Sequence, residues 1–409
     1  MTADGKPRAA QRITWTHAAV AAWAIMFAVV AVRVVVQPNS HDCWKPFYEA
    51  AGRNWLHGVD LYQNTFATCR YSPLINALFA PLALAPSTVG ALLWRGILAG
   101  AFLGGMFWLL RVCAAPTWTR THWALAFLIV FPLAASNINA GQANPLMTGL
   151  LLAAAAAVGR QRWNLAAALT VGACLLKIYP IAFALILIVA YPRRFLPRFL
   201  IALAVGLALP FLLQDPLWVA RQYSNWWTSL YIDDRTQWSF DFCYRDLWML
   251  IRFYELPVSR DGYRAIQLGV AAVMAAVCLT GRWRAQWSCT ETANTALGLA
   301  ACWMTVCGPT TEGGGYILLT PTLAWALLES WRRPWPVGFR ALLLASAAAL
   351  VVGAMVSAPD NAGLLMAYGM HPFGGLLLTA ALFGDAVRRI LVPPTPAAEA
   401  SPAPAARAA

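Results

Sequence analysis

Long apolar runs separated by short polar segments dominate the chain. The first run extends from about His17 to Val36, and about 20 apolar residues are enough to cross the hydrocarbon core of a bilayer. Further apolar runs of the same kind lie at residues 73–86, 88–112, 122–136, 144–159, 163–176, 178–191, 196–213, 264–281, 295–308, 316–330, 341–357 and 364–386. The pattern predicts an all-α polytopic membrane protein with about twelve transmembrane helices.

Basic residues mark one side of the membrane. Arginines recur in short connections at 160–162, 193–198, 282–284 and 332–340, as is typical of cytoplasmic loops. The two longest polar stretches, about 37–72 and 214–262, are then predicted to be outer loops. Counting every run between residues 73 and 159 as a full crossing places Arg160 outside, so one of these runs should be broken or re-entrant.

The polar stretches also define the domain organisation. We expect a cytoplasmic tail over residues 1–16, a single transmembrane domain over 17–390, and a disordered Pro/Ala-rich tail over 391–409. Within the loop 37–72, apolar residues recur among polar ones at the spacing of a helix, which predicts a short interfacial helix.

Composition supports this class. Of the 409 residues, 60% are hydrophobic and 11% are charged, and the mean hydropathy is +0.57, whereas soluble domains carry about 25% charged residues. The net charge of +13 reflects basic cytoplasmic loops and does not indicate a nucleic-acid partner. Abundant Ala and Arg are typical of a GC-rich bacterial genome.

The nine cysteines show no metal-ligand spacing. No cofactor is predicted, although a divalent metal is possible. A disulfide between Cys43 and Cys69 would close the first outer loop if that loop faces an oxidising compartment.

Asp42 is the first candidate for chemistry. It directly follows the first apolar run and His41, at the start of the polar loop. A carboxylate in this position could act as a general base. The alternative is an ordinary exposed loop carboxylate.

Lys177 interrupts an apolar stretch and is followed by Tyr179 and Pro180. A proline opens the helix and frees backbone groups, and an ionisable residue at membrane depth indicates function. Lys177 could bind a lipid phosphate inside a cavity. It could also be a lysine at a tight turn that reaches for lipid headgroups.

Three further polar segments are candidates. Asn137–Pro145 holds Gln142 and Asn144, whose amides could bind sugar hydroxyls if the turn lines a wet cavity; the alternative is a plain surface loop. Glu312 lies in a Gly-rich run and could orient an acceptor, bind a metal, or cap the next helix. Arg245 could bind phosphate, but pairing with Asp246 or Asp241 is the favoured interpretation.

Taken in order, these motifs resemble glycosyltransferase family 87, whose members have the GT-C fold and use polyprenyl-phosphate sugars. The motifs that carry the resemblance are Asp42 after the first span, Gly58-Val59-Asp60-Leu61-Tyr62, Arg70-Tyr71-Ser72-Pro73-Leu74, Gly141-Gln142-Ala143-Asn144, Lys177 to Pro180, and Gly308-Pro309 followed by Glu312. They extend over about residues 40 to 330. One departure is the segment around Glu312, where many members carry a histidine.

The resemblance implies a mannosyltransferase-like enzyme of the bacterial inner membrane, with its site facing the periplasm or exterior. It implies transfer with inversion of a sugar such as mannose from polyprenyl phosphate to a glycolipid or glycan acceptor, with Asp42 as general base. The remaining site residues are expected to be Lys177, Arg245 and Arg70 on the donor phosphate, and His41, Tyr71, Gln142, Asn144, Tyr179 and Glu312 on substrate.

Two other classes remain open. A secondary transporter or lipid-linked-sugar flippase would also have about twelve spans and buried charge, but it should show internal repeats, and none is obvious. A non-catalytic scaffold for envelope assembly would tolerate loss of the Asp42 carboxylate. Long aromatic loops on one side of the membrane favour an enzyme.

Overall fold

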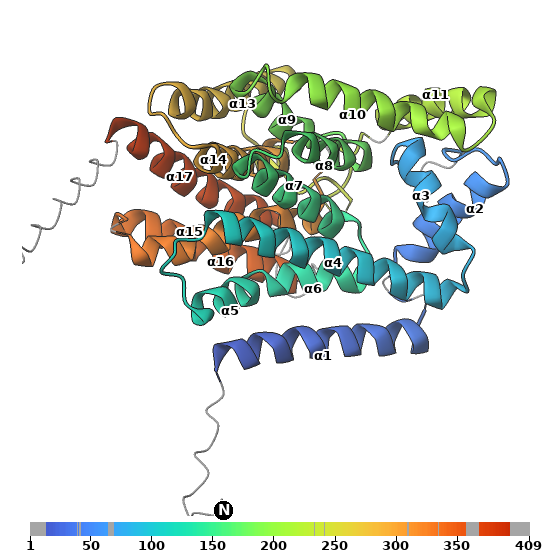
Figure 1. Ribbon diagram of the computed structural model, residues 1–409, viewed down its shortest axis with the longest axis horizontal. Coiled ribbons are helices and arrows are strands. Elements are labelled where there is room, and N and C mark those ends of the chain that lie inside the picture. The colour runs from blue at the N-terminus through green and yellow to red at the C-terminus, as the bar shows by residue number, and fades with distance from the viewer. Residues whose placement is uncertain are drawn as a thin grey trace, which may run out of the picture.

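In the computed structural model, residues 14–38, 40, 42–63, 69–232, 234–240, 242–308, 311–333, 335–356 and 368–392 are described. Within them all regular secondary structure is helical (Figure 1), which confirms the all-α prediction. The α-helices are α1 (Trp15–Val36), α2 (Ala50–Leu56), α3 (Pro73–Ala83), α4 (Ser87–Cys113), α5 (Arg120–Ile129), α6 (Phe131–Ala140), α7 (Asn144–Gly159), α8 (Trp163–Leu176), α9 (Ile181–Ala190), α10 (Leu196–Ala208), α11 (Pro216–Ile232), α12 (Leu247–Phe253), α13 (Arg260–Trp283), α14 (Cys289–Cys302), α15 (Thr320–Arg332), α16 (Val337–Met355) and α17 (Met370–Leu391). Short π and 3₁₀ turns extend some of them: η1 (Trp44–Glu49), η2 (Leu209–Leu212), η3 (Trp303–Cys307) and η4 (Gly313–Leu319).

Length and apolarity select the helices that can cross a membrane. Among the described residues, α1, α4, α13, α16 and α17 qualify alone. The pair α5 and α6 qualifies together but bends by 49°, in agreement with the broken run expected between residues 73 and 159. Five or six candidate spans are therefore supported, rather than about twelve, because five further apolar stretches are only 10–17 residues long.

The stretch 214–262 differs from the prediction of a loop. It contains α11, a 17-residue helix, and the short helix α12. Aromatic and polar residues alternate along α11, so no apolar run marks it in the sequence. In the first polar loop, η1 and α2 together form a continuous helix over residues 44–56, as the spacing there predicts. Its position on a membrane surface stays a prediction.

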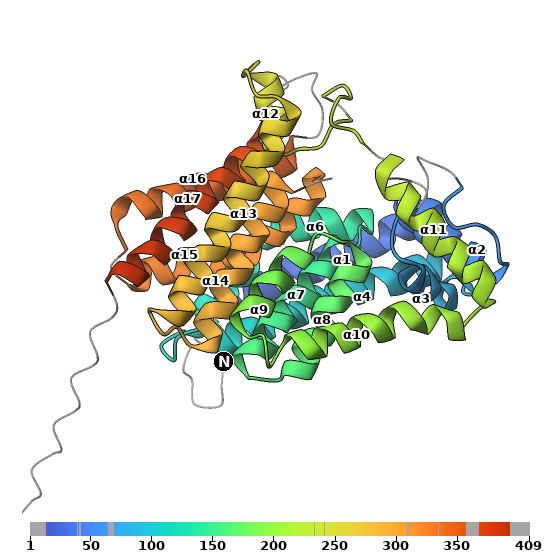
Figure 2. The ribbon, with the colours of Figure 1, turned by 90° about the horizontal axis from the view of Figure 1, so that it is seen from above.

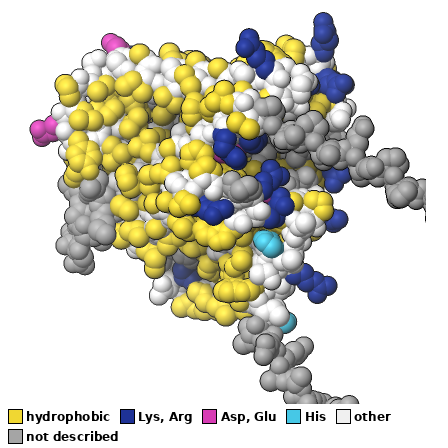
Figure 3. All heavy atoms as spheres, turned by 90° about the vertical axis from the view of Figure 1, so that its left-hand side faces the viewer, with side chains coloured by type: hydrophobic (Ala, Val, Ile, Leu, Met, Phe, Trp, Pro, Cys, Tyr) yellow, Lys and Arg dark blue, Asp and Glu magenta, His cyan; other side chains and the backbone are white. Residues whose placement is uncertain are grey.

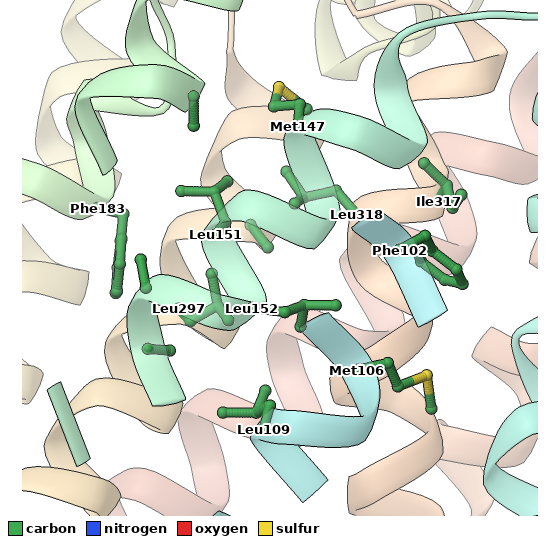
Figure 4. Packing of buried hydrophobic residues seen from close by; sticks show 14 of the residues in the cluster. Phe102, Met106, Leu109, Met147, Leu151, Leu152, Phe183, Leu297, Ile317 and Leu318 are labelled. Carbon is green, nitrogen blue, oxygen red and sulfur yellow. The ribbon is translucent and has the colours of Figure 1, made fainter. Parts of the chain in front are cut away.

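The core centres on the crossing of α4 and α7. Phe102, Met106 and Leu109 of α4 and Met147, Leu151 and Leu152 of α7 belong to one buried cluster in Figure 4, with residues of α9, α14 and η4 beside them. A Cβ atom added at Gly105 would lie 2.3 Å from the carbonyl oxygen of Gly149. Small residues thus let the two helix backbones touch, as is common among membrane helices.

The ends of the molecule differ in character. The N-terminal end of α1 and the C-terminal end of α17 both face left in Figure 1, and Figure 3 shows Lys and Arg side chains gathered over that end. Helices α2, α3 and α11 lie at the opposite end in Figures 1 and 2. Packing of the first polar loop against α11 therefore occurs away from the termini.

Candidate functional site

A cavity of about 700 Å³ lies where the polar segments meet the helix bundle. Its walls come from η1, the segment 69–71, the start of α7, the junction of α8 and α9, α11, the segment 235–244, η3 and the residue before η4. The sequence places these segments far apart, and packing of the bundle brings them together.

Lys177 extends into this cavity from the break between α8 and α9. It follows the last residue of α8 in extended conformation, and Pro180 directly precedes α9. Its Nζ donates a 2.8 Å hydrogen bond to Asn144 Oδ1 and lies 5.7 Å from the ring centroid of Tyr179. Among the described residues no carboxylate pairs with this ammonium. Within the described part of the wall, Lys177 is thus a cation that no carboxylate contacts directly.

A chain of side-chain amides supports Lys177. Asn144 Nδ2 donates to Asn137 Oδ1 at 3.0 Å and to Gln142 Oε1 at 3.1 Å. Gln142 and Asn144 line the cavity, which is one of the two alternatives that the sequence leaves open for this turn, whereas the buried Asn137 is not in the lining.

Two arginines and one glutamate complete the charged lining. Arg70, Arg235 and Glu312 all line the cavity. The Nη1 atom of Arg235 lies 2.9 Å from Oε1 of Glu312. Glu312 stands at the N-cap position of η4, but its side chain makes no capping hydrogen bond, so the capping interpretation is wrong. Among the described lining residues, three cationic side chains (Lys177, Arg70 and Arg235) therefore accompany a single carboxylate, Glu312.

Residues of the Gly58–Tyr62 motif form hydrogen bonds that hold the part of the cavity wall containing Arg70. Asp60 Oδ2 accepts a 3.0 Å hydrogen bond from Asn225 of α11, and Tyr62 Oη donates to the Tyr71 carbonyl at 2.7 Å. Trp226 Nε1 donates to the Arg70 carbonyl at 3.0 Å. The first polar loop and α11 thus hold the Arg70–Tyr71 backbone from both sides.

Aromatic rings form much of the remaining surface. Tyr71 stacks on Tyr48 with ring centroids 5.8 Å apart, and their hydroxyls are 3.2 Å apart. Sequence reasoning identified Tyr71 and Tyr179 but missed the other aromatic residues of the lining, which are Phe47, Tyr48, Trp226, Trp238, Phe242, Tyr244 and Trp303. For the four of these that lie in 214–262, the abundance of aromatic residues in that stretch was the available signal, and it indicated a membrane interface.

Asp42 lies behind the wall of the cavity. The neighbouring Cys43 lines the cavity, whereas the side chain of Asp42 is only 5% exposed. Its Oδ1 accepts hydrogen bonds from Arg95 Nη2 at 2.8 Å and from the Trp44 amide at 3.2 Å. Its Oδ2 accepts a longer bond of 3.3 Å from the Lys45 amide. Asp42 therefore accepts hydrogen bonds from the first two backbone amides of η1 and pairs with a buried arginine.

Arg95 is a functional candidate that sequence reasoning missed. It lies within α4, is 3% exposed, and also donates to the Asn139 carbonyl at 2.9 Å. An arginine inside the apolar run 88–112 was an available signal, because a charge at membrane depth needs a partner.

Other predicted residues lie elsewhere. Arg245 is not in the lining; its guanidinium lies over the ring of Tyr368, 4.8 Å from the centroid. The expected pair with Asp246 is absent from the described residues, since Asp246 caps α12 through a 3.1 Å bond from the Met249 amide. His41 and Asp241 fall outside the described residues.

The disulfide considered between Cys43 and Cys69 is not formed: both are free thiols, and both lie in the cavity lining. In the described part of the chain, no group of three or more His, Cys, Asp or Glu side chains is placed to hold a metal ion.

This arrangement suits an anionic, partly apolar ligand. Lys177 and the two arginines can bind phosphate oxygens, aromatic faces can pack against a sugar ring, and apolar residues such as Leu176 and Ile181 can contact a lipid chain. Among the described residues, Glu312 in the lining and Asp42 behind it are the carboxylates that we consider as a base.

The model of glycosyltransferase family 87 matches residues 70–309, more than half of the chain. The matched part contains the lining residues Arg70, Gln142, Asn144 and Lys177, whereas Asp42 precedes it and Glu312 follows it. No curated protein matches the chain significantly. The family match covers most of the cavity wall, and the chain therefore belongs to glycosyltransferase family 87, as a multi-pass membrane glycosyltransferase.

Proposed function

We propose that the chain transfers a hexose such as mannose from a polyprenyl-phosphate donor to a hydroxyl of a glycolipid or glycan. The reaction takes place in the 700 Å³ cavity, at the outer face of a bacterial inner membrane. About twelve crossings would give this topology, which requires most of the shorter apolar helices to cross as well.

The observation that carries this proposal is the unneutralised ammonium of Lys177. A largely buried charge is costly without a counter-charge. Among the described residues, Lys177 forms no ion pair: its ammonium donates to Asn144 and lies near the ring of Tyr179, while the Glu312 carboxylate of the same lining is paired with Arg235. A donor phosphate supplies the missing negative charge. Arg70 and Arg235 from the same lining provide further donors. Arg245 lies outside the lining, so it has no part in this assignment.

The chemistry requires one bond to form and one to break. The acceptor oxygen bonds to the anomeric carbon while the bond from that carbon to the phosphate oxygen breaks. The polyprenyl phosphate leaves with the bonding electrons, and the acceptor proton passes to a carboxylate. Cations near the departing phosphate stabilise its growing charge. Inversion follows if attack and departure occur on opposite faces of the sugar.

Asp42 is our choice for the base. Among the described residues, its Oδ2 accepts only a long 3.3 Å bond, from the backbone amide of Lys45. We therefore expect this oxygen to turn past Cys43 into the cavity when an acceptor binds. Glu312 is the rival, because it already lines the cavity and its side chain is half exposed. Its pairing with Arg235 suggests that it holds that arginine in place.

The experiment is a transfer assay on the purified full chain. A panel of labelled polyprenyl-phosphate sugars is incubated with membrane extract as the source of acceptor, and the labelled product is identified. We expect one lipid-linked sugar to be consumed. In Lys177→Ala, the KM for the donor should rise about tenfold or more, since a charged hydrogen bond is lost, while the KM for the acceptor changes little. Failure of the wild type to use any lipid-linked sugar, or an unchanged donor KM in the variant, would overturn the proposal.

A further inference from the structure

We infer that Gly314 is a positioning residue for Lys177. The backbone of η4 at Gly314 lies against the amide chain that holds the ammonium, so the side chain at position 314 controls the orientation of Asn144 and, through it, of Lys177. The consequence for donor binding rests on the proposed function, but the positioning itself does not.

The amide of Asn144 has one orientation that satisfies all its neighbours. Its Nδ2 donates to two oxygens, Asn137 Oδ1 and Gln142 Oε1, and its Oδ1 accepts from Lys177 Nζ. A rotation by 180° would place an NH₂ group against an ammonium and an oxygen against two oxygens. Asn137 and Gln142 therefore orient the Asn144 oxygen toward Lys177.

Asn137 is itself fixed. Its Nδ2 donates to the Leu133 carbonyl at 2.9 Å, which leaves its Oδ1 facing Asn144. The backbone N–H of Gln142 donates to the backbone carbonyl of Asn137 at 3.0 Å. The chain of amides thus starts on the backbone of α6 and ends on the ammonium of Lys177.

Gly314 lies directly on this chain. A Cβ atom at position 314 would be 2.0 Å from Gln142 Oε1, 2.9 Å from Asn137 Oδ1 and 3.0 Å from Asn144 Nδ2. All three contacts are with side-chain ends rather than with backbone. Gln142 can move aside, but only by giving up its bond from Asn144. An added methyl group should therefore disturb the amide orientation while costing the fold little.

The adjacent Gly315 provides a matched control. A Cβ atom there would meet only Thr311 Cγ2, at 3.5 Å, which is ordinary van der Waals contact. Both glycines belong to η4, so alanine at either position changes the same helical turn by the same group.

The direct test is acylation of the lysines in Gly314→Ala, Gly315→Ala and the wild type. The chain has three lysines, Lys6, Lys45 and Lys177, and the exposed Lys45 serves as internal reference. A hydrogen bond to the ammonium favours the unreactive charged form. We expect Lys177 to react severalfold faster in Gly314→Ala than in the wild type, with no change in Gly315→Ala and no change at Lys45. Equal Lys177 rates in the two alanine variants would overturn the inference.

Kinetics give the second readout. Gly314→Ala should raise the donor KM about tenfold and leave kcat and the unfolding temperature close to those of Gly315→Ala. When Gly314→Ala is combined with Lys177→Ala, the donor KM should be no higher than in Lys177→Ala alone, because both changes act through the same ammonium group. A donor KM higher in the double variant than in Lys177→Ala would also overturn the inference.

The two assays separate this inference from the proposed function. If the wild type uses no lipid-linked sugar but Lys177 reactivity follows position 314, the donor assignment fails and the positioning role stands. If sugar transfer is observed but Lys177 is acylated at the same rate in Gly314→Ala and in the wild type, only the positioning role of Gly314 fails.

Discussion

Single charged side chains decide what the cavity can accept. Lys177, Arg70 and Arg235 outnumber the one lining carboxylate, Glu312, so the described lining favours an anion. The sequence identified three of these four, because a lysine beside a proline, an arginine in an aromatic motif and a glutamate among glycines each stand out locally. Arg235 lies in a stretch of mixed charge and gave no such signal.

Asp246 offers a test of the loop near the cavity. Burial raises its pKa to about 7, although the backbone amides of Met249 and Trp248 oppose this. In the unfolded chain an aspartate titrates near 3.9. Between these values the folded state holds a proton that the unfolded state does not, so the stability contributed by Asp246 is full below about pH 4 and falls as the pH rises toward 7.

We therefore predict that Asp246→Asn, which can still cap α12, is more stable than the wild type at pH 8, by up to a few kcal/mol. The advantage should shrink steadily toward pH 4–5. Thermal unfolding temperatures of both proteins across this range provide the measurement. A difference that does not vary with pH would show that the carboxyl titrates normally in the folded protein.

At the scale of elements, the contact between α4 and α7 holds the bundle behind the cavity. The neighbouring glycines 104 and 105 of α4 allow a clean comparison. A Cβ atom at Gly105 meets the Gly149 backbone at 2.3 Å, whereas one at Gly104 meets nothing within 4 Å. Backbone cannot move aside as a side chain can, so the helices must separate.

We predict that Gly105→Ala lowers the free energy of unfolding by about 1–3 kcal/mol, and that Gly104→Ala leaves it unchanged or raises it slightly through helix propensity. Unfolding in detergent, followed by circular dichroism, measures both. Similar stabilities for the two variants would mean that α4 and α7 are not in close contact.

Apolar runs predicted most helices well. Residues 144–159 and 163–176 are α7 and α8 as predicted, and the first span begins at Trp15 rather than near His17. The runs could not reveal α11, because its aromatic and polar residues are mixed. Nor could they distinguish a crossing from a short buried helix, because both are apolar. The cavity itself depends on long-range packing between segments such as 69–71 and α11, which periodicity does not encode.

At the scale of the whole molecule, the two ends differ (Figure 1). One end is basic and contains the N-terminal end of α1 and the C-terminal end of α17, and the opposite end contains α2, α3 and α11. The family match includes Lys177 but starts after Asp42. The family match therefore gives no support to Asp42 as the base, and that proposal relies on the position of Asp42 beside the cavity. In the structure Asp42 pairs with Arg95 at 2.8 Å, with both side chains at most 5% exposed, and this creates a competing explanation for any loss of activity.

The most direct measurement compares stability and sugar transfer in the wild type, Asp42→Asn, Arg95→Gln and the double variant. Breaking a buried pair from either side should cost roughly 3–5 kcal/mol, because one charge is left alone. Removing both charges should restore most of that stability. If Asp42 is the base, the double variant folds well yet transfers sugar at least about a hundredfold more slowly than the wild type. A double variant that transfers sugar at the wild-type rate would contradict the account, and with loss of activity in Glu312→Gln it would make Glu312 the base.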